Sequence, residues 1–192
     1  GLQLFWQQQA FPRDFARVKT VVPWIQYVAY CLSGKLVTEI SGMACQSHLL
    51  NIRDGGYSSL VKRMGWEPLF PPMAKAWETI GTLRGEFLGN GFRGRGNVLA
   101  GVHDSNANYL RYLAGGQKKF TLLSTGTWII GFDTETGLAS LIEEKDTVSN
   151  TDVFGNRVGS GRFFGGREFE IVSGGASGDM ASLAAVQDLI AT

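Results

Sequence analysis

The sequence predicts a mixed α/β fold. Apolar residues recur at helical spacing over residues 24–32 and 105–114, whereas residues 97–102, 120–124 and 128–132 form short apolar runs typical of buried strands. The chain has 192 residues, of which 44% are hydrophobic and only 5 are proline, so it is long and apolar enough to bury a core. Its 26 glycines follow no G-X-Y period, which excludes a collagen-like protein.

The first part of the chain is predicted to be mainly helical. Residues 4–9 form the first expected helix, and Pro12 begins a second one at a position where its missing N–H costs nothing. The β-branched run at residues 18–22 is expected to be a short strand. Helices are then expected over residues 24–32 and 57–64, each followed by a glycine that can end it.

A change of pattern suggests a boundary near the middle of the chain. Residues 67–81 are irregular and contain a proline doublet. Beyond them the strand at residues 97–102 ends at His103 and Asp104, and the helix at residues 105–114 follows.

A hairpin is expected next, with a small tip that carries hydroxyl groups. Its strands are residues 120–124 and 128–132. Residues 133–168 are rich in turn-forming residues and receive no assignment, whereas residues 179–190 are expected to be helical. The chain starts with Gly and stops within this helical pattern, so we expect it to be a piece of a longer protein.

The balance of charge excludes several classes of protein. The chain has 18 Lys and Arg against 17 Asp and Glu, which is not the basic excess of a nucleic-acid-binding protein. No apolar run is long enough for a membrane span. Cys31 and Cys45 lack the spacing of a redox or metal motif, so they are expected to be reduced thiols of a cytoplasmic protein.

Several common site motifs are absent or incomplete. Residues 89–94 fit G-x-G-x-x-G, but no strand precedes them and a strand follows, so a dinucleotide site is not expected there. The sequence has no Walker A motif and no G-x-S-x-G elbow. His48 and His103 are too far apart in sequence for a zinc motif, and no metal ligand is assigned.

Asp104 has two interpretations from its position alone. It lies where a strand gives way to a helix, an edge of α/β sheets at which ligands commonly bind, and it can accept a proton from a substrate hydroxyl. An Asp at this position can equally be an ordinary helix cap.

The hairpin tip also has two interpretations. Ser124, Thr125, Gly126 and Thr127 offer backbone N–H groups and hydroxyls that can cradle phosphate oxygens. The same residues can also form a simple turn.

An ordered set of motifs resembles the FGGY carbohydrate kinases. Two of them, VLAGVHDSNAN at residues 98–108 and LSTGTWIIGF at residues 123–132, are similar to the rhamnulokinase-like branch of that family. YVAYCLSG at residues 27–34 and GRFFGGREF at residues 161–169 also resemble family segments. The likeness extends over nearly the whole chain.

The resemblance implies an actin-like (ribonuclease H-like) fold of two α/β domains, with a sugar and ATP bound between them. Residues 1–82 would close the first, sugar-binding domain, and residues 83–192 would begin the second, ATP-binding domain. Asp104 corresponds to the general base of the family, and His103 would contact the sugar or orient Asp104. The hairpin tip corresponds to the segment that lies against the phosphates of ATP, which acts with Mg²⁺. The implied substrate is a ketose or deoxyketose, and the full-length protein could be a homodimer.

The chain also departs from the family pattern. It lacks the opening phosphate hairpin with its metal-associated aspartate, the sugar-binding part of the first domain and the later adenosine loop. Gln26 stands where many relatives have aspartate, which leaves the sugar preference open. We therefore expect the 192-residue chain to have no kinase activity alone. The alternative function is a non-catalytic actin-like module that binds a nucleotide or a partner.

Overall fold

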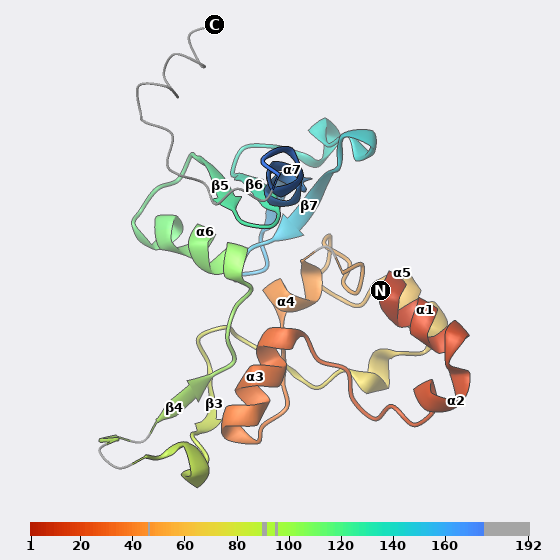
Figure 1. Cartoon of the computed structure of the whole chain (residues 1–192), viewed down its shortest axis with the longest axis vertical. Helices are drawn as coiled ribbons and strands as arrows, with labels where there is room; N and C mark the ends of the chain where they lie inside the picture. The colour runs from red at the N-terminus through yellow and green to blue at the C-terminus, as the bar shows by residue number, and fades with distance from the viewer. Residues whose placement is uncertain (46, 90–91, 95, 175–192) are drawn as a thin grey trace, which may run out of the picture.

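In the part of the chain that the structure describes, the fold combines helices with three small β-sheets. A computed structural model describes residues 1–45, 47–89, 92–94 and 96–174. In Figure 1, α1, α2 and α5 lie on one side of the molecule, α3 and α4 lie near its centre, and the largest sheet lies beyond them beside α6. The element bounds are α1 Leu2–Ala10, α2 Pro12–Phe15, α3 Trp24–Ser33, α4 Ile40–Ala44, α5 Ser59–Met64, α6 Asp104–Ala114 and α7 Gly165–Val172. Short 3₁₀ turns occur at Glu67–Leu69, Gly85–Phe87, Leu138–Ser140 and Glu143–Lys145.

Proline and glycine mark the ends of the early helices where the sequence predicts them. Pro12 is the first residue of α2, and Gly34 and Gly65 adopt left-handed conformations with φ of 75° and 67° directly after α3 and α5. The predicted helix at residues 57–64 starts later than expected, because the Ser58 hydroxyl caps α5 by accepting a hydrogen bond from the Val61 N–H.

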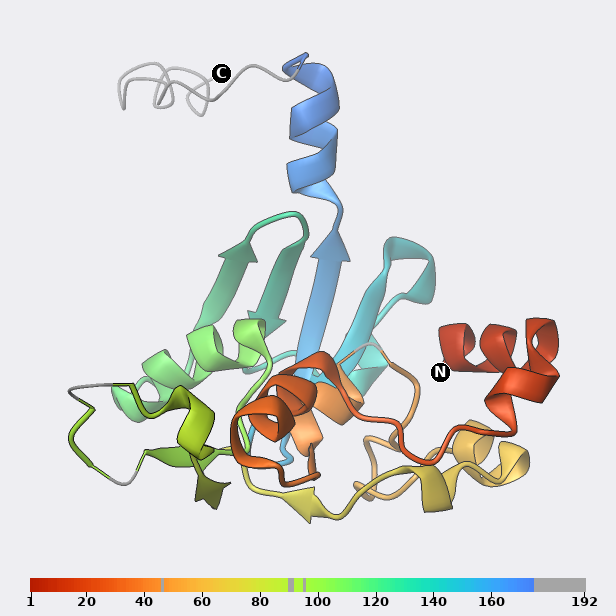
Figure 2. The ribbon, with the colours of Figure 1, turned by 60° about the horizontal axis from the view of Figure 1, so that its bottom comes forward.

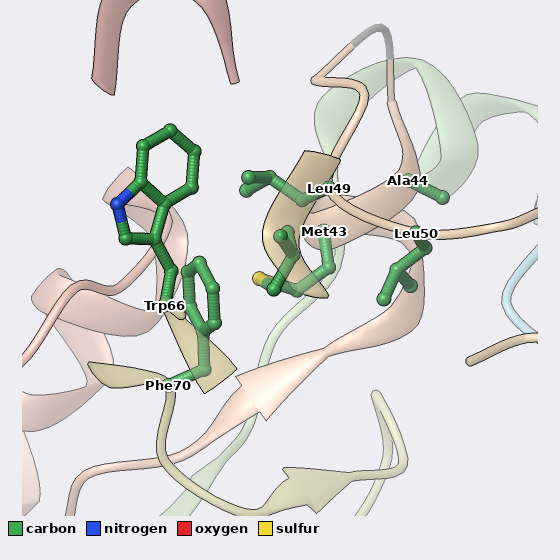
Figure 3. Packing of buried hydrophobic residues seen from close by; sticks show 7 residues of the cluster. Met43, Ala44, Leu49, Leu50, Trp66 and Phe70 are labelled. Atoms are coloured by element: carbon green, nitrogen blue, oxygen red, sulfur yellow. The ribbon is translucent and has the colours of Figure 1, made fainter. Parts of the chain in front are cut away.

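The first hydrophobic core lies among α4, α5 and the segments beside them. Figure 3 shows its labelled side chains, which come from three separate stretches of the chain and point toward one another. Its buried members are Met43, Ala44, Leu49, Leu50, Val61, Trp66 and Phe70. The Trp66 indole also donates a 2.9 Å hydrogen bond to Gln8, which attaches α1 to this core.

Two small sheets connect the helical part to the rest of the chain. β1 (Thr38–Glu39) pairs in parallel with β2 (Met73–Ala74), and β3 (Thr79–Thr82) pairs antiparallel with β4 (Asn97–Leu99). β4 is shorter than the predicted strand at residues 97–102, because the chain turns at Gly101, where φ is 85°.

The largest sheet is antiparallel and has four strands in the order β5-β6-β8-β7. Its strands are β5 Thr121–Thr125, β6 Ile129–Asp133, β7 Thr147–Thr151 and β8 Arg157–Phe163. β5 and β6 form the predicted hairpin, with Thr125 opposite Ile129 beside the tip. In Figure 2 the strands stand above the layer of helices, and α7 continues outward from the end of β8.

A second core joins α6 to this sheet. It contains Tyr109 from α6 together with Leu122, Ile130, Phe132 and Val158 from the strands. Ile130 and Phe132 are buried two positions apart on β6, as expected for a strand with one face on the core. Because α6 packs on this sheet, its first residue, Asp104, lies near the hairpin.

Some predicted elements differ from the structure. The predicted strand at residues 18–22 is wrong: Val21 donates a backbone hydrogen bond to the Leu69 carbonyl, but no strand in the described part of the chain pairs with the segment. Residues 133–168, which received no assignment, contain β7 and β8 and the start of α7. The helix predicted at residues 179–190 lies outside the described residues.

None of the helices in the described ranges combines the length and the apolar composition that a membrane crossing requires.

Candidate active site

Asp104 is presented at the start of α6 with its side chain open to solvent. The side chain is 92% exposed, and Asp104 is the first residue inside the helix rather than its N-cap, which is His103. Its Oδ1 accepts a 2.6 Å hydrogen bond from the adjacent Ser105 N–H. Because the helix has no side-chain cap hydrogen bond, the interpretation of Asp104 as a standard helix cap is wrong.

His103 lies beside this carboxylate. Its Nδ1 is 3.1 Å from Asp104 Oδ1, and its side chain is 28% exposed. The backbone N–H of His103 donates a 3.0 Å hydrogen bond to the Ser41 hydroxyl of α4. The imidazole is therefore close enough to orient Asp104 and remains accessible to a ligand.

The hairpin tip faces the same space as Asp104. Its residues are Ser124, Thr125, Gly126 and Thr127, and the β5–β6 register places Ser124 opposite Ile130. Ser124 lies 3.5 Å from the Asn108 amide of α6, measured between Oγ and Nδ2. This contact links the tip to the helix that carries Asp104.

The start of α7 packs directly against the hairpin tip. A Cβ atom added at Gly166 would lie 2.2 Å from the Gly126 carbonyl oxygen and 2.9 Å from the Thr127 Cα. Only a residue without a side chain fits this contact.

A single cleft of about 290 Å³ brings the predicted site residues together. It is lined by Cys45, His103, Asp104, Ser105, Ser124, Thr125, Gly126, Thr127, Trp128 and Ile130. All six residues singled out from the sequence border this cleft. His103 and Asp104 lie at the start of α6, whereas the other four form the tip of the β5–β6 hairpin. The described residues of the glycine-rich run at 89–96 do not line it.

Four lining residues were not predicted as site residues. Trp128 follows the hairpin tip, and its ring lies 4.3 Å from that of Phe164 between centroids. Ile130 is core-facing on β6, and Ser105 follows Asp104 directly. Cys45 directly follows the distant helix α4, and the sequence around it carries no signal of a site.

Cys45 is a neutral thiol at physiological pH. Burial raises its pKa to about 11, and the negative charge of Asp104 acts in the same direction. The structure records Cys31 and Cys45 as free cysteines, as predicted. A protonated thiol gives this wall of the cleft a small and weakly polar surface.

An ion pair between Arg162 and Asp146 lies beside Trp128. The Arg162 guanidinium carbon lies 6.0 Å from the centre of the Trp128 ring, and Arg162 Nε donates a 2.7 Å hydrogen bond to Asp146 Oδ1. That hydrogen bond lowers the pKa of Asp146 and raises that of Arg162. This ion pair joins β8 to the residue directly before β7.

The chain matches known families over both of its parts. A model of the N-terminal domain of the FGGY family of carbohydrate kinases matches residues 1–110, and a model of the carbohydrate kinase FGGY C-terminal domain matches residues 117–192. No curated protein is similar enough to the chain to count as a match.

Solved structures agree with the family matches. A carbohydrate kinase from Novosphingobium aromaticivorans is 39% identical with a TM-score of 0.74, over 88% of this chain and 38% of that one. A xylulose kinase from Rhodospirillum rubrum is 18% identical with a TM-score of 0.66, over 98% of this chain and 39% of that one. A ligand-bound xylulose kinase from Lactobacillus acidophilus is 16% identical with a TM-score of 0.69, over 89% of this chain and 35% of that one.

The last two structures support the fold alone, because their identities are low. They agree with the predicted α/β, actin-like fold. The chain spans less than two fifths of the length of each of these three proteins.

Proposed function

Because the chain belongs to the FGGY family of carbohydrate kinases, we propose that it supplies the proton-accepting and phosphate-binding part of the active site of an ATP-dependent sugar kinase. The observation that carries the proposal is the shared cleft of Asp104 and the hairpin tip. A carboxylate and a cluster of hydroxyl and N–H donors around one space are the groups that phosphoryl transfer requires.

Asp104 acts as the general base. Its exposed carboxylate accepts the proton of the sugar hydroxyl as that oxygen forms a bond to the γ-phosphorus of ATP. The bond from the γ-phosphorus to the bridging β–γ oxygen breaks, and ADP leaves. The three contacts recorded for the carboxylate among the described residues, from the Ser105 N–H, the Ser105 hydroxyl and His103 Nδ1, all use Oδ1, which leaves Oδ2 to receive the proton.

The hairpin tip binds the phosphates. Ser124, Thr125 and Thr127 provide hydroxyl donors, and Gly126 brings the backbone close to a ligand without a side chain in the way. Hydrogen bonds from these groups spread the negative charge that moves during transfer.

The sugar lies on the side of the cleft that contains His103. Because His103 Nδ1 is buried and lies 3.1 Å from Asp104 Oδ1, Nε2 is the nitrogen that exchanges a hydrogen bond with a sugar hydroxyl. The motifs at residues 98–108 and 123–132 favour the rhamnulokinase-like branch and hence a ketose or deoxyketose. Gln26 is fully buried and does not line the cleft, so it acts on sugar choice only indirectly.

Mg²⁺ accompanies ATP in this proposal. Within the described ranges, no group of three His, Cys, Asp or Glu side chains could hold a metal ion. The single carboxylate and the hydroxyls of the cleft fit a cation that is held mainly by the nucleotide phosphates and water. When bound, the ion neutralises phosphate charge.

The remaining parts of the enzyme come from outside this chain. We propose that residues 1–82 complete the sugar-binding domain and that residues 83–192 begin the ATP-binding domain. The chain alone is expected to have no kinase activity, whereas the full-length protein phosphorylates the sugar and could do so as a homodimer.

Steady-state kinetics of the full-length protein with a panel of ketoses tests the role of Asp104. Asp104→Asn is expected to lower kcat by about 10²–10⁴-fold, the usual contribution of a general base. Asp14→Asn is a matched control, because Asp14 also lies in the first turn of a helix and its side chain is 78% exposed. Turnover of Asp104→Asn within a few-fold of the parent would favour the rival function, a non-catalytic module that binds a nucleotide or a partner.

A further inference from the structure

Three fully buried polar side chains lie behind the loop that leads to Asp104. They are Gln26 in α3, Glu39 in β1 and Ser41 in α4, each with no measurable exposure. None of them lines the cleft. Burying a carboxylate and an amide costs free energy unless they make hydrogen bonds. A specific role of these three side chains is therefore expected in the hydrogen bonds that they make.

The hydrogen bonds run in one direction from the loop to Glu39. The His103 N–H donates to Ser41 Oγ at 3.0 Å, and the Ser41 hydroxyl donates to Glu39 Oε2 at 2.5 Å. Ser41 has a single proton, so its bond to Glu39 leaves its oxygen free to accept from His103. Glu39 Oε2 also accepts from the Gly42 N–H at 3.0 Å, which fixes the carboxylate on the start of α4.

Gln26 hydrogen-bonds to the other end of the loop formed by residues 100–103. Its amide Nε2 donates a 3.0 Å hydrogen bond to the Ala100 carbonyl. The next residue, Gly101, has φ of 85°, and a Cβ there would lie 2.7 Å from Ile25 Cγ2. Residues 100–103 are thus held at both ends by groups that are distant in sequence.

The position of Asp104 depends on this loop, because its own side chain is almost fully exposed. Among the residues that the structure describes, the carboxylate makes hydrogen-bond or ion-pair contacts only to the adjacent residues His103 and Ser105. A base must lie within hydrogen-bond reach of the proton that it accepts, and displacement by about 1 Å can cost roughly 10²-fold in rate.

We propose that Ser41 and Glu39, with Gln26 as a second anchor, are positioning residues that set the place of Asp104 in the cleft. This inference rests on the proposed role of Asp104 as general base. Ser41 acts through the His103 backbone and touches neither sugar nor nucleotide. Loss of its hydroxyl lowers the rate of proton and phosphoryl transfer while the binding surfaces for both substrates stay intact.

Kinetics of Ser41→Ala in the full-length protein test this inference. We expect kcat to fall by roughly tenfold or more, with the KM values for sugar and ATP changed less than about threefold. Ser41→Thr keeps the hydroxyl and is expected to restore most of kcat. Thr38→Val is the matched control, because Thr38 is equally buried and its hydroxyl donates to the Pro71 carbonyl, away from the loop.

A double variant separates this inference from the proposed function. If Asp104 is the base and Ser41 acts through it, Ser41→Ala adds little to the loss in Asp104→Asn. The inference is overturned if Ser41→Ala behaves like Thr38→Val, or if its effect is fully additive with that of Asp104→Asn. The proposed function fails separately, if Asp104→Asn alone leaves turnover intact.

A second variant covers the case in which Ser41→Ala does not fold. Ser41→Cys fills a similar volume but replaces the hydroxyl with a weak acceptor. The same fall in kcat with unchanged KM values is expected of it, and parent-like kcat would overturn the inference.

Discussion

The two sides of the cleft are held in place by different interactions. On the Asp104 side, buried polar groups hydrogen-bond to the backbone of the preceding loop through Ser41 and Gln26. On the hairpin side, strand pairing sets the tip, and Gly166 packs against the Gly126 backbone without a side chain between them. Hydrogen bonds thus orient a reactive side chain that must stay exposed, whereas close packing supports a tip whose own backbone is the binding surface.

The largest expected effect comes from truncating a buried side chain in the hydrophobic core behind each side of the cleft. Phe132 lies under the hairpin side and Met43 lies in α4 on the other side, and both are almost fully buried. Phe132→Ala is expected to cost about 3–5 kcal/mol and Met43→Ala about 2–5 kcal/mol, since each leaves a cavity.

Amide hydrogen exchange of the full-length variants locates these losses. Phe132→Ala should speed exchange in β5, β6 and β8, and Met43→Ala should speed it in α4 and α5. Equal acceleration in both regions for either variant would mean that the cores do not support the two sides separately.

The next effect concerns the thiol on the Asp104 side. A pKa of about 11 for Cys45 is two units above the ordinary value of 9.0, so its thiolate is roughly 100-fold scarcer near pH 8. Folding raises the pKa of the Cys45 thiol, so the folded state binds this proton more tightly than the unfolded chain does. The free energy of unfolding therefore falls as the pH rises from 9.0 to about 11.

The pH dependence of iodoacetamide alkylation measures this shift. In a Cys31→Ser background, the rate at Cys45 is expected to reach half of its maximum near pH 11 in the folded protein and near pH 9 in the denatured chain. Restricted access of the reagent to the thiol would slow the reaction at every pH and leave its midpoint unchanged. A midpoint near 9 in the folded protein would contradict the assignment.

The smallest of the three effects is on the hairpin side. Gly166→Ala forces the tip away from α7, because its Cβ would lie 2.2 Å from a backbone oxygen. A hydrogen bond to a charged group contributes about 1.5–3 kcal/mol, so one misplaced donor should raise the KM for ATP by at least about tenfold. Gly137→Ala is the control, since nothing lies within 4 Å of its added Cβ. An unchanged KM for ATP in Gly166→Ala would show that the contact does not support phosphate binding.

Local patterns predicted much of the fold. The hairpin and α6 were expected because apolar periodicity and a glycine-containing tip act over neighbouring residues. β7 and β8 were missed because β8 contains Gly159 and Gly161 and most of β7 is polar, so neither has the alternation of a typical strand. The strand expected at residues 18–22 has suitable residues but no partner strand, which local sequence cannot reveal.

The site was predictable to a similar degree. His103, Asp104 and the tip residues stand in recognisable motifs, and the structure places them around one cleft. Ser41 and Cys45 were not predicted, because their relation to Asp104 depends on contacts between segments distant in sequence. The roles of the site residues and the boundary at residue 82 stay predictions.

The division of roles between the two sides of the cleft is tested most directly by comparing Asp104→Asn and Gly166→Ala in one kinetic experiment on the full-length protein. We predict that Asp104→Asn lowers kcat with little change in the KM for ATP, and that Gly166→Ala raises the KM for ATP with a smaller change in kcat. The opposite pattern, or a loss of ATP binding in both variants alike, would contradict a cleft in which one side accepts the proton and the other binds the phosphates.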